Sequence, residues 1–168
     1  MEDIKLKMDS SFTRLSKGCW ETYTFVRDKY DIQKLALEFY GDNVDTFDVD
    51  KFIGNAVLNT DRFQDMIIRL MKKCNKTFES CNRYAGTVKA VLDILGIKSN
   101  IMVGFAVEKT MVGKLKGKTL EKGVSANHVW VIAENNQVYE RNRLGGSLIR
   151  YCGINICYWN GSEEECYT

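Results

Sequence analysis

The 168-residue chain has no proline, a single histidine and no apolar run of membrane-spanning length. A transmembrane helix needs about 20 consecutive apolar residues, so this class of protein is excluded. The chain starts Met-Glu-Asp-Ile-Lys-Leu-Lys-Met-Asp, which is charged where a signal peptide is apolar. The sequence therefore predicts a protein of the cytoplasm, or of the host cytoplasm if it is viral, with no membrane partner.

The lack of proline accompanies abundant lysine, asparagine and isoleucine, a composition met in AT-rich genomes, including those of many bacteriophages. The net charge is only +2, whereas dedicated nucleic-acid binders are strongly basic. Nucleic acid is therefore not expected as a partner. With 45% hydrophobic residues the chain can bury a substantial core, and its length fits one domain over residues 1–168.

Six cysteines raise the question of disulfides or a metal site. Without a secretory signal, free thiols are the expected state. Cys152, Cys157 and Cys166 have no histidine near them that would complete a zinc site. Cys19 and Cys74 are expected to be buried apolar residues. We therefore predict no metal and no cofactor.

Residues 80–107 predict a helix followed by a strand. Ser80 is a preferred N-cap residue, and Gly96 is a natural C-terminal stop. The apolar residues between them have the spacing of one helical face: Tyr84, Val88, Val91, Leu92 and Leu95. From Ile101 to Val107 both faces of the strand are apolar, which indicates a central place in a sheet.

Cys81 falls on the first turn of this helix. Unpaired backbone N–H groups and the positive end of the helix dipole favour a thiolate there. Cys81 is therefore a candidate nucleophile. The alternative is a small buried apolar residue, which is the commoner role for a cysteine taken at random.

His128 opens an alternating segment, residues 128–142, in which an Asn-Asn pair suits a hairpin turn. A three-residue loop over residues 135–137 would pair Ile132 with Glu140. Glu140 would then lie on the same sheet face as His128, because side chains alternate along a strand. A four-residue loop would reverse this parity, so both arrangements remain open.

Cysteine acyl-transfer chemistry needs a nucleophile, a base and an acceptor that orients the base. Cys81 would attack a carbonyl carbon, and His128 would hold the thiolate as an ion pair and then protonate the leaving group. Glu140, or alternatively Asn142 two residues on, would orient the imidazole ring. The other interpretation of His128 is a packed core residue.

A cysteine opens a helix, Leu-Gly-Ile ends it, a strand closes on Val-Gly-Phe, and His-Val-Trp and Val-Tyr-Glu lie on the next two strands. The residues concerned are Cys81, Tyr84, Ala85, Leu92, Leu95, Gly96, Ile97, Val103, Gly104, Phe105, His128, Trp130, Val138, Tyr139 and Glu140. In this order they resemble the core of the transglutaminase-like superfamily of papain-fold cysteine enzymes. The resemblance covers residues 78–142. Glu140 stands where the family usually has aspartate, and the proline common after that acid is missing.

The resemblance implies an α+β fold in which a helical N-terminal half packs on a mostly antiparallel sheet, with the nucleophile helix between them. It also implies a cysteine hydrolase or acyltransferase, of protease, deamidase or glycanase type, that acts on amide bonds of a protein or peptide through a Cys81 thioester. A different class of function stays open: a non-catalytic protein with this scaffold that sequesters a host protein or ligand.

Four residues are expected to bind substrate. Trp130 would form a wall beside the imidazole, and Tyr84 lies on the nucleophile helix. Lys114 and Lys116 belong to a lysine-rich insertion, residues 108–125, that would contact an acidic or phosphorylated partner. The alternative for this insertion is a solvated loop. The oxyanion hole would use the Cys81 N–H and one further donor from these candidates: Trp20, Gln64, Asn75 and Asn82.

The remaining pattern predicts amphipathic helices and flanking strands. Helical spacing covers residues 19–40, as one helix or two, and then residues 49–58 and 61–74. Alternation predicts an edge strand or an ordered arm near residues 4–8, and one or two strands after Arg143. Glu163 to Glu165 are expected to form a solvated acidic end.

Overall fold

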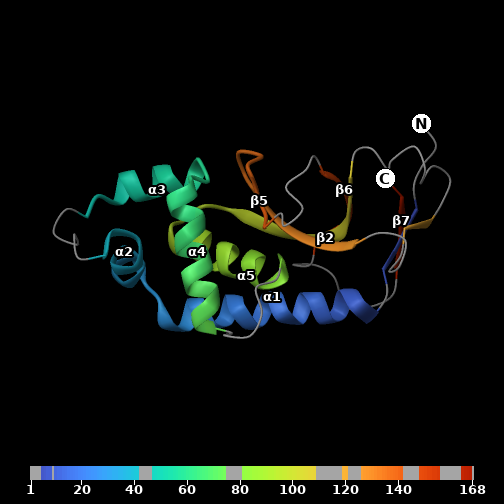
Figure 1. Cartoon of the computed structure of the whole chain (residues 1–168), viewed down its shortest axis with the longest axis horizontal. Coiled ribbons are helices and arrows are strands. Elements are labelled where there is room, and N and C mark those ends of the chain that lie inside the picture. Colours follow the sequence, from blue (N-terminus) through green and yellow to red (C-terminus); the bar gives the residue numbers. More distant parts are fainter. Residues whose placement is uncertain are drawn as a thin grey trace.

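The computed structural model describes residues 5–8, 10–41, 47–74, 81–108, 119–120, 126–141, 148–155 and 164–167. The helices are α1 (Ser10–Lys29), α2 (Ile32–Tyr40), α3 (Val49–Val57), α4 (Asp61–Cys74) and α5 (Cys81–Ile94). The strands are β1 (Lys5–Met8), β2 (Ser99–Glu108), β3 (Thr119–Leu120), β4 (Ala126–Ala133), β5 (Val138–Tyr139), β6 (Leu148–Asn155) and β7 (Glu164–Tyr167). The α+β class predicted from the sequence is confirmed (Figure 1).

The strands that the structure describes form two sheets. The larger has the strand order β5-β4-β2-β6 with antiparallel pairs throughout, and the smaller has the order β3-β1-β7. β2 has a neighbour on each side, which confirms its predicted central position. Helix α5 contacts α1 and α4 as well as β2 and β4, so this helix lies between the helical half and the sheet (Figure 1).

The helix boundaries follow from their capping residues. The predicted 19–40 segment is two helices, and the first begins earlier, at Ser10. The carboxylates of Asp31 and Asp48 accept hydrogen bonds from backbone N–H groups three residues on, at 2.9 and 3.1 Å. Gly41 ends α2 with a φ of 61°, a value that glycine adopts without strain. Thr60 caps α4 through its hydroxyl, which accepts a 3.2 Å hydrogen bond from the backbone N–H of Phe63.

Helices α1 and α5 run side by side at close range because glycine stands where their backbones meet. A Cβ on Gly86 would overlap the backbone oxygen of Cys19 and the hydroxyl of Thr22. Thr22 is fully buried and bonds back to the carbonyls of Gly18 and Cys19, at 3.1 and 2.9 Å. No larger residue fits at Gly86 without moving one helix, so this contact fixes the position of α5.

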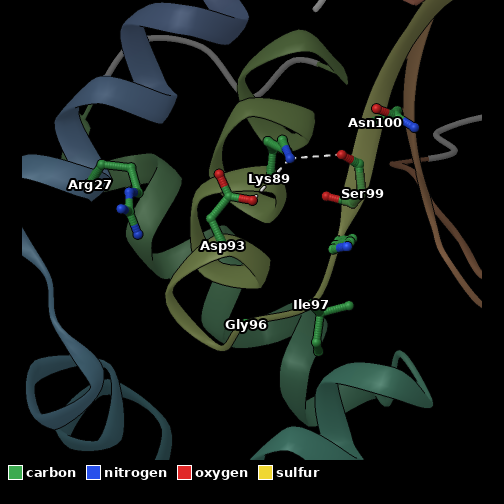
Figure 2. A pocket seen from close by; sticks show the side chains of 8 residues that line it. Arg27, Lys89, Asp93, Gly96, Ile97, Ser99 and Asn100 are labelled. Atoms are coloured by element: carbon green, nitrogen blue, oxygen red, sulfur yellow. Dashed lines mark hydrogen bonds and ion pairs between the residues drawn. The ribbon is translucent and has the colours of Figure 1, made fainter.

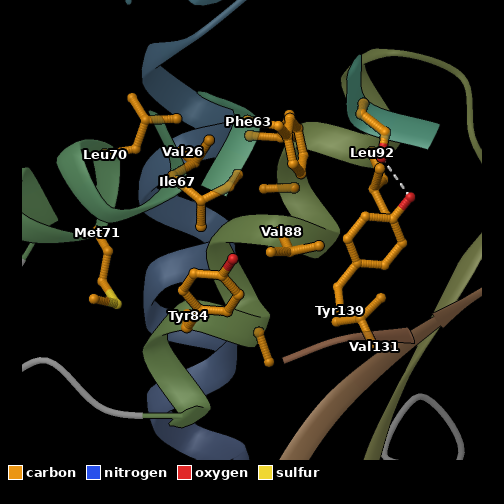
Figure 3. Packing of buried hydrophobic residues seen from close by; sticks show 14 of the residues in the cluster. Val26, Phe63, Ile67, Leu70, Met71, Tyr84, Val88, Leu92, Val131 and Tyr139 are labelled. Atoms are coloured by element: carbon orange, nitrogen blue, oxygen red, sulfur yellow. Dashed lines mark hydrogen bonds between the residues drawn. The ribbon is translucent and has the colours of Figure 1, made fainter. Parts of the chain in front are cut away.

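The core joins the helices to one face of the sheet (Figure 3). Phe63 and Ile67 of α4 and Val88 of α5 are fully buried together with Val131 of β4 and Tyr139 of β5. The Tyr139 hydroxyl donates a 2.7 Å hydrogen bond to the carbonyl oxygen of Ala56 in α3, and its ring lies edge-on to Phe63. Tyr139 therefore fixes β5 against the helical half.

The C-terminal end of α5 is tied to its neighbours by a polar cluster. Lys89 donates to the carboxylate of Asp93 at 2.9 Å and to the carbonyl oxygen of Ser99 in β2 at 2.7 Å (Figure 2). Asp93 also accepts a 2.6 Å bond from the Tyr23 hydroxyl of α1. Lys89, Asp93 and Ser99 border a surface hollow of about 560 Å³ that is also lined by Arg27. It lies at the other end of α5 from Cys81.

Part of the predicted acidic end, Glu163 to Glu165, lies in a strand. Glu164 and Glu165 belong to β7, which pairs antiparallel with β1. Leu6 of β1 lies opposite Cys166 in this register. The charges hid the strand, because the pairing is made by backbone groups and does not need an apolar sequence.

Three thiols with described side chains are free: Cys19, Cys74 and Cys81. Cys19 is fully buried as predicted, whereas Cys74 is only half-buried. Among the described residues no group of three or more metal-ligating side chains comes together. Within the same part of the chain, no helix has both the length and the hydropathy to cross a bilayer.

Gly86→Ala tests the close contact of α1 and α5. We expect it to destabilise the protein by about 1–3 kcal/mol, because overpacking at backbone contact forces the helices apart. Gly54→Ala in α3 is the matched control, since a Cβ there meets no atom within 4 Å. Higher helix propensity should make this control more stable by about 0.5–1 kcal/mol. Urea unfolding of both variants measures the difference, and equal behaviour would refute the close contact.

Candidate active site

Cys81 is the first residue of α5, as predicted, and is half-buried at the margin of the hydrophobic core. The first-turn N–H groups of a helix have no partner within it, so they face whatever lies beside the cysteine. Ser80, the predicted cap, lies outside the described residues. The position of Cys81 thus fits a sulfur that is held by the core and open to a reactant on one side.

The hairpin that follows His128 has a three-residue loop, but one position earlier than predicted. The observed pairs are Val131 with Tyr139 and Ile132 with Val138, so the loop is 134–136 and the register differs by two residues. Asn136 adopts a φ of 65°, a left-handed conformation that asparagine tolerates better than most residues. The turn forms where a residue can adopt this conformation at low energetic cost. The sequence pattern alone did not indicate which residue that would be.

A shift of two residues preserves parity. The alternation of strand side chains therefore keeps Glu140 on the same face as His128, as predicted, and excludes the opposite parity. If the observed pairing is continued by one more pair on this face, Glu140 lies beside Trp130. This position is closer to His128 than the one in the predicted register. Tyr139, the residue before it, points into the core on the other face.

His128 links the two other candidate residues. Its Nε2 atom lies 2.7 Å from Oε2 of Glu140. Cys81 raises the pKa of the same imidazole, so the sulfur lies near the ring. Cys81, His128 and Glu140 thus come together in one site.

The surroundings shift both titrating groups of the His128–Glu140 pair toward their charged forms. Burial acts to lower the pKa of His128, but hydrogen bonds with Cys81 and Glu140 and their negative charge raise it from 6.5 to about 9. Burial acts to raise the pKa of Glu140, but bonds from Arg150 and His128 lower it from 4.5 to about 2. At neutral pH the two residues therefore form an imidazolium–carboxylate pair.

Trp130 lies against the imidazole, as predicted. The two rings are stacked, with centroids 5.6 Å apart and an interplanar angle of 22°. Trp130 is 2% exposed, yet it is not part of the main hydrophobic cluster, which includes Val129 and Val131 from the other face of β4. The indole therefore covers the histidine and keeps water from one side of its ring.

Arg150, which the sequence analysis did not single out, also belongs to the site. Its Nε donates to Oε2 of Glu140 at 2.8 Å, and its Nη2 donates to Oε1. It comes from β6, where an alternating apolar pattern gave no reason to select one charged residue. The available signal was an arginine within a strand expected to be mostly apolar.

The other predicted site residues do not gather here. Tyr84 is 2% exposed and lies in the hydrophobic core (Figure 3), where burial raises the pKa of its hydroxyl. It therefore packs the helix and has almost no surface with which to bind a substrate. Lys114, Lys116 and Asn142 lie outside the described residues.

Two of the four candidate oxyanion donors have other partners. The Gln64 amide donates to the carbonyl oxygen of Asn59 at 2.7 Å, and the Asn82 amide lies 3.4 Å from that of Leu15. Asn75 lies outside the described residues. Trp20 is half-buried and packs edge-on against Tyr23.

Comparison of the chain with protein-family models, curated proteins and solved structures found no match. The chemistry of the site is therefore argued from its own geometry.

A pH titration by NMR tests the charges of the site. His128 is the only histidine, so its ring protons give one unambiguous signal. We expect a midpoint near 9 in the wild type. Glu140→Gln and Cys81→Ser should each lower it, because each removes a negative charge that favours the imidazolium. A midpoint near the ordinary 6.5 in all three proteins would contradict this arrangement.

Proposed function

We propose that this chain is a cysteine-dependent hydrolase or acyltransferase with a transglutaminase-like, papain-fold core. It would act on amide bonds of a protein or peptide through a thioester at Cys81. The observation that carries the proposal is the imidazole of His128, which bonds Glu140 at 2.7 Å and whose pKa is raised by the neighbouring Cys81. Nucleophile, base and orienting acceptor are the parts that such chemistry requires.

In the first half-reaction the Cys81 thiolate attacks the amide carbon, and the carbonyl oxygen takes the negative charge. The backbone N–H of Cys81, at the helix start, is suited to donate to this oxygen. As the intermediate collapses, the C–N bond breaks and the imidazolium of His128 gives its proton to the leaving nitrogen. A thioester and a neutral imidazole result.

In the second half-reaction the neutral imidazole accepts a proton from an incoming nucleophile. Water attacks the thioester carbon to give a carboxylic acid, or a primary amine attacks to give a new amide. The C–S bond breaks, and the thiolate and imidazolium return. Glu140 keeps the ring aligned through both steps and stabilises its protonated form.

Alkylation by iodoacetamide tests whether Cys81 is activated. At pH 7 we expect Cys81 to react at least about ten times faster than Cys74, which is also half-buried but whose pKa is raised by burial. Cys19 should react more slowly still, because it is fully buried. Mass spectrometry of peptides after brief exposure measures the three rates in one sample.

His128→Ala is the decisive variant in this assay. It should slow the alkylation of Cys81 to about the rate of Cys74, because the thiolate loses its ion-pair partner. The rates of Cys19 and Cys74 should not change, which separates an effect on the site from unfolding. If Cys81 keeps its rate in this variant, the catalytic proposal fails.

A peptide mixture rich in asparagine and glutamine, supplied with a labelled primary amine, distinguishes the possible reactions. New peptide termini indicate a peptidase, conversion of side-chain amides to acids indicates a deamidase, and incorporation of the label indicates acyl transfer. Every product should vanish in Cys81→Ala. Retention of peptides without turnover, equal in both proteins, would favour the non-catalytic binding protein.

A further inference from the structure

Arg150 and His128 both form hydrogen bonds with the Glu140 carboxylate. Its guanidinium approaches the carboxylate with two nitrogens, so that each carboxylate oxygen has one donor from the arginine. Oε2 accepts from both Arg150 and His128, at 2.8 and 2.7 Å. The Glu140 side chain is 11% exposed, so these bonds have little competition from water.

The sheet leaves room for the Arg150 side chain to reach Glu140. Arg150 lies opposite Ala106 of β2, and His128 lies opposite Gly104 of the same strand. Paired residues of antiparallel strands project to the same face, so Gly104 and Ala106 lie between the arginine and the histidine. Because both are small, the arginine and glutamate side chains can meet above β2. Larger residues at these two positions would occupy that space.

From these contacts we infer that Arg150 is a positioning residue of the active site, one that holds Glu140 in the orientation needed to bond His128. This inference rests on the proposed function, which it extends from three residues to four. Glutamate has one more rotatable bond than aspartate, so its carboxylate has more orientations to lose. The planar fork of arginine fixes both oxygens at once, which a single point charge does not do.

The charge of Arg150 and its geometry act in opposite directions on His128. As a nearby positive charge, Arg150 disfavours the imidazolium, so its removal would raise the titration midpoint of His128. As a positioning residue it maintains the bond between His128 and Glu140, so its removal would lower that midpoint. The other titratable groups beside His128 are Cys81 on α5 and Glu140 after β5, and neither is substituted in this comparison.

The test combines NMR titration of His128 with alkylation of Cys81 in the full chain. In Arg150→Gln we expect the titration midpoint of His128 to fall by about one pH unit, which corresponds to a tenfold change in the protonation equilibrium of the imidazole. Cys81 alkylation at pH 7 should fall about tenfold with it. Arg150→Lys should also lower both the His128 midpoint and the rate of Cys81 alkylation, since lysine keeps the positive charge but not the planar two-nitrogen contact.

Two further variants control the experiment. Arg69→Gln removes an arginine that donates to the backbone of α2, and it should leave both readings unchanged. The double variant with Glu140→Gln and Arg150→Gln should match Glu140→Gln alone, because residues that act through one interaction are not additive.

The inference is overturned if the midpoint stays or rises in Arg150→Gln, or if Arg150→Lys behaves as the wild type. Its failure is distinct from failure of the proposed function. If His128→Ala slows alkylation but Arg150→Gln does not, only the role of Arg150 is lost. If His128→Ala has no effect on Cys81, the proposed function is lost whatever the midpoint does.

Discussion

The imidazole of His128 stands where the two halves of the molecule meet. His128 comes from β4 of the large sheet, whereas Cys81 comes from the helix that the N-terminal half packs against that sheet. The two side chains stay close only while α5 keeps its place relative to β4. The glycine contact with α1 and the Lys89 cluster at the far end of α5 both serve that placement.

The same strands supply the core and the site from opposite faces. Val129 and Val131 of β4 are buried in the hydrophobic cluster, and the alternating residues His128 and Trp130 lie on the other face. After β5 the pattern repeats, since Tyr139 is bonded into the core and its neighbour Glu140 bonds His128. Packing on one face thus determines the register, and the register determines which groups meet on the other.

Local chemistry explains what the sequence predicted well. Helix spacing, capping residues and the Gly96 stop depend on near neighbours, so α5, the strand after it and the parity of the hairpin could be derived. The exact register depended on which asparagine takes the left-handed conformation, a difference of small energy that the pattern does not encode. Arg150 was missed because its partner is distant in sequence and across a strand.

The pairing of Leu6 with Cys166 has a consequence for how the protein is made. Synthesis proceeds from the N-terminus, so β1 leaves the ribosome long before β7 exists to pair with it. Arg150 likewise emerges after His128 and Glu140. Contacts between such distant segments form slowly, because a long loop must close first. A nascent chain would therefore carry Cys81, His128 and Glu140 before β6, and the contacts of Arg150 with Glu140 would form only after that strand had emerged.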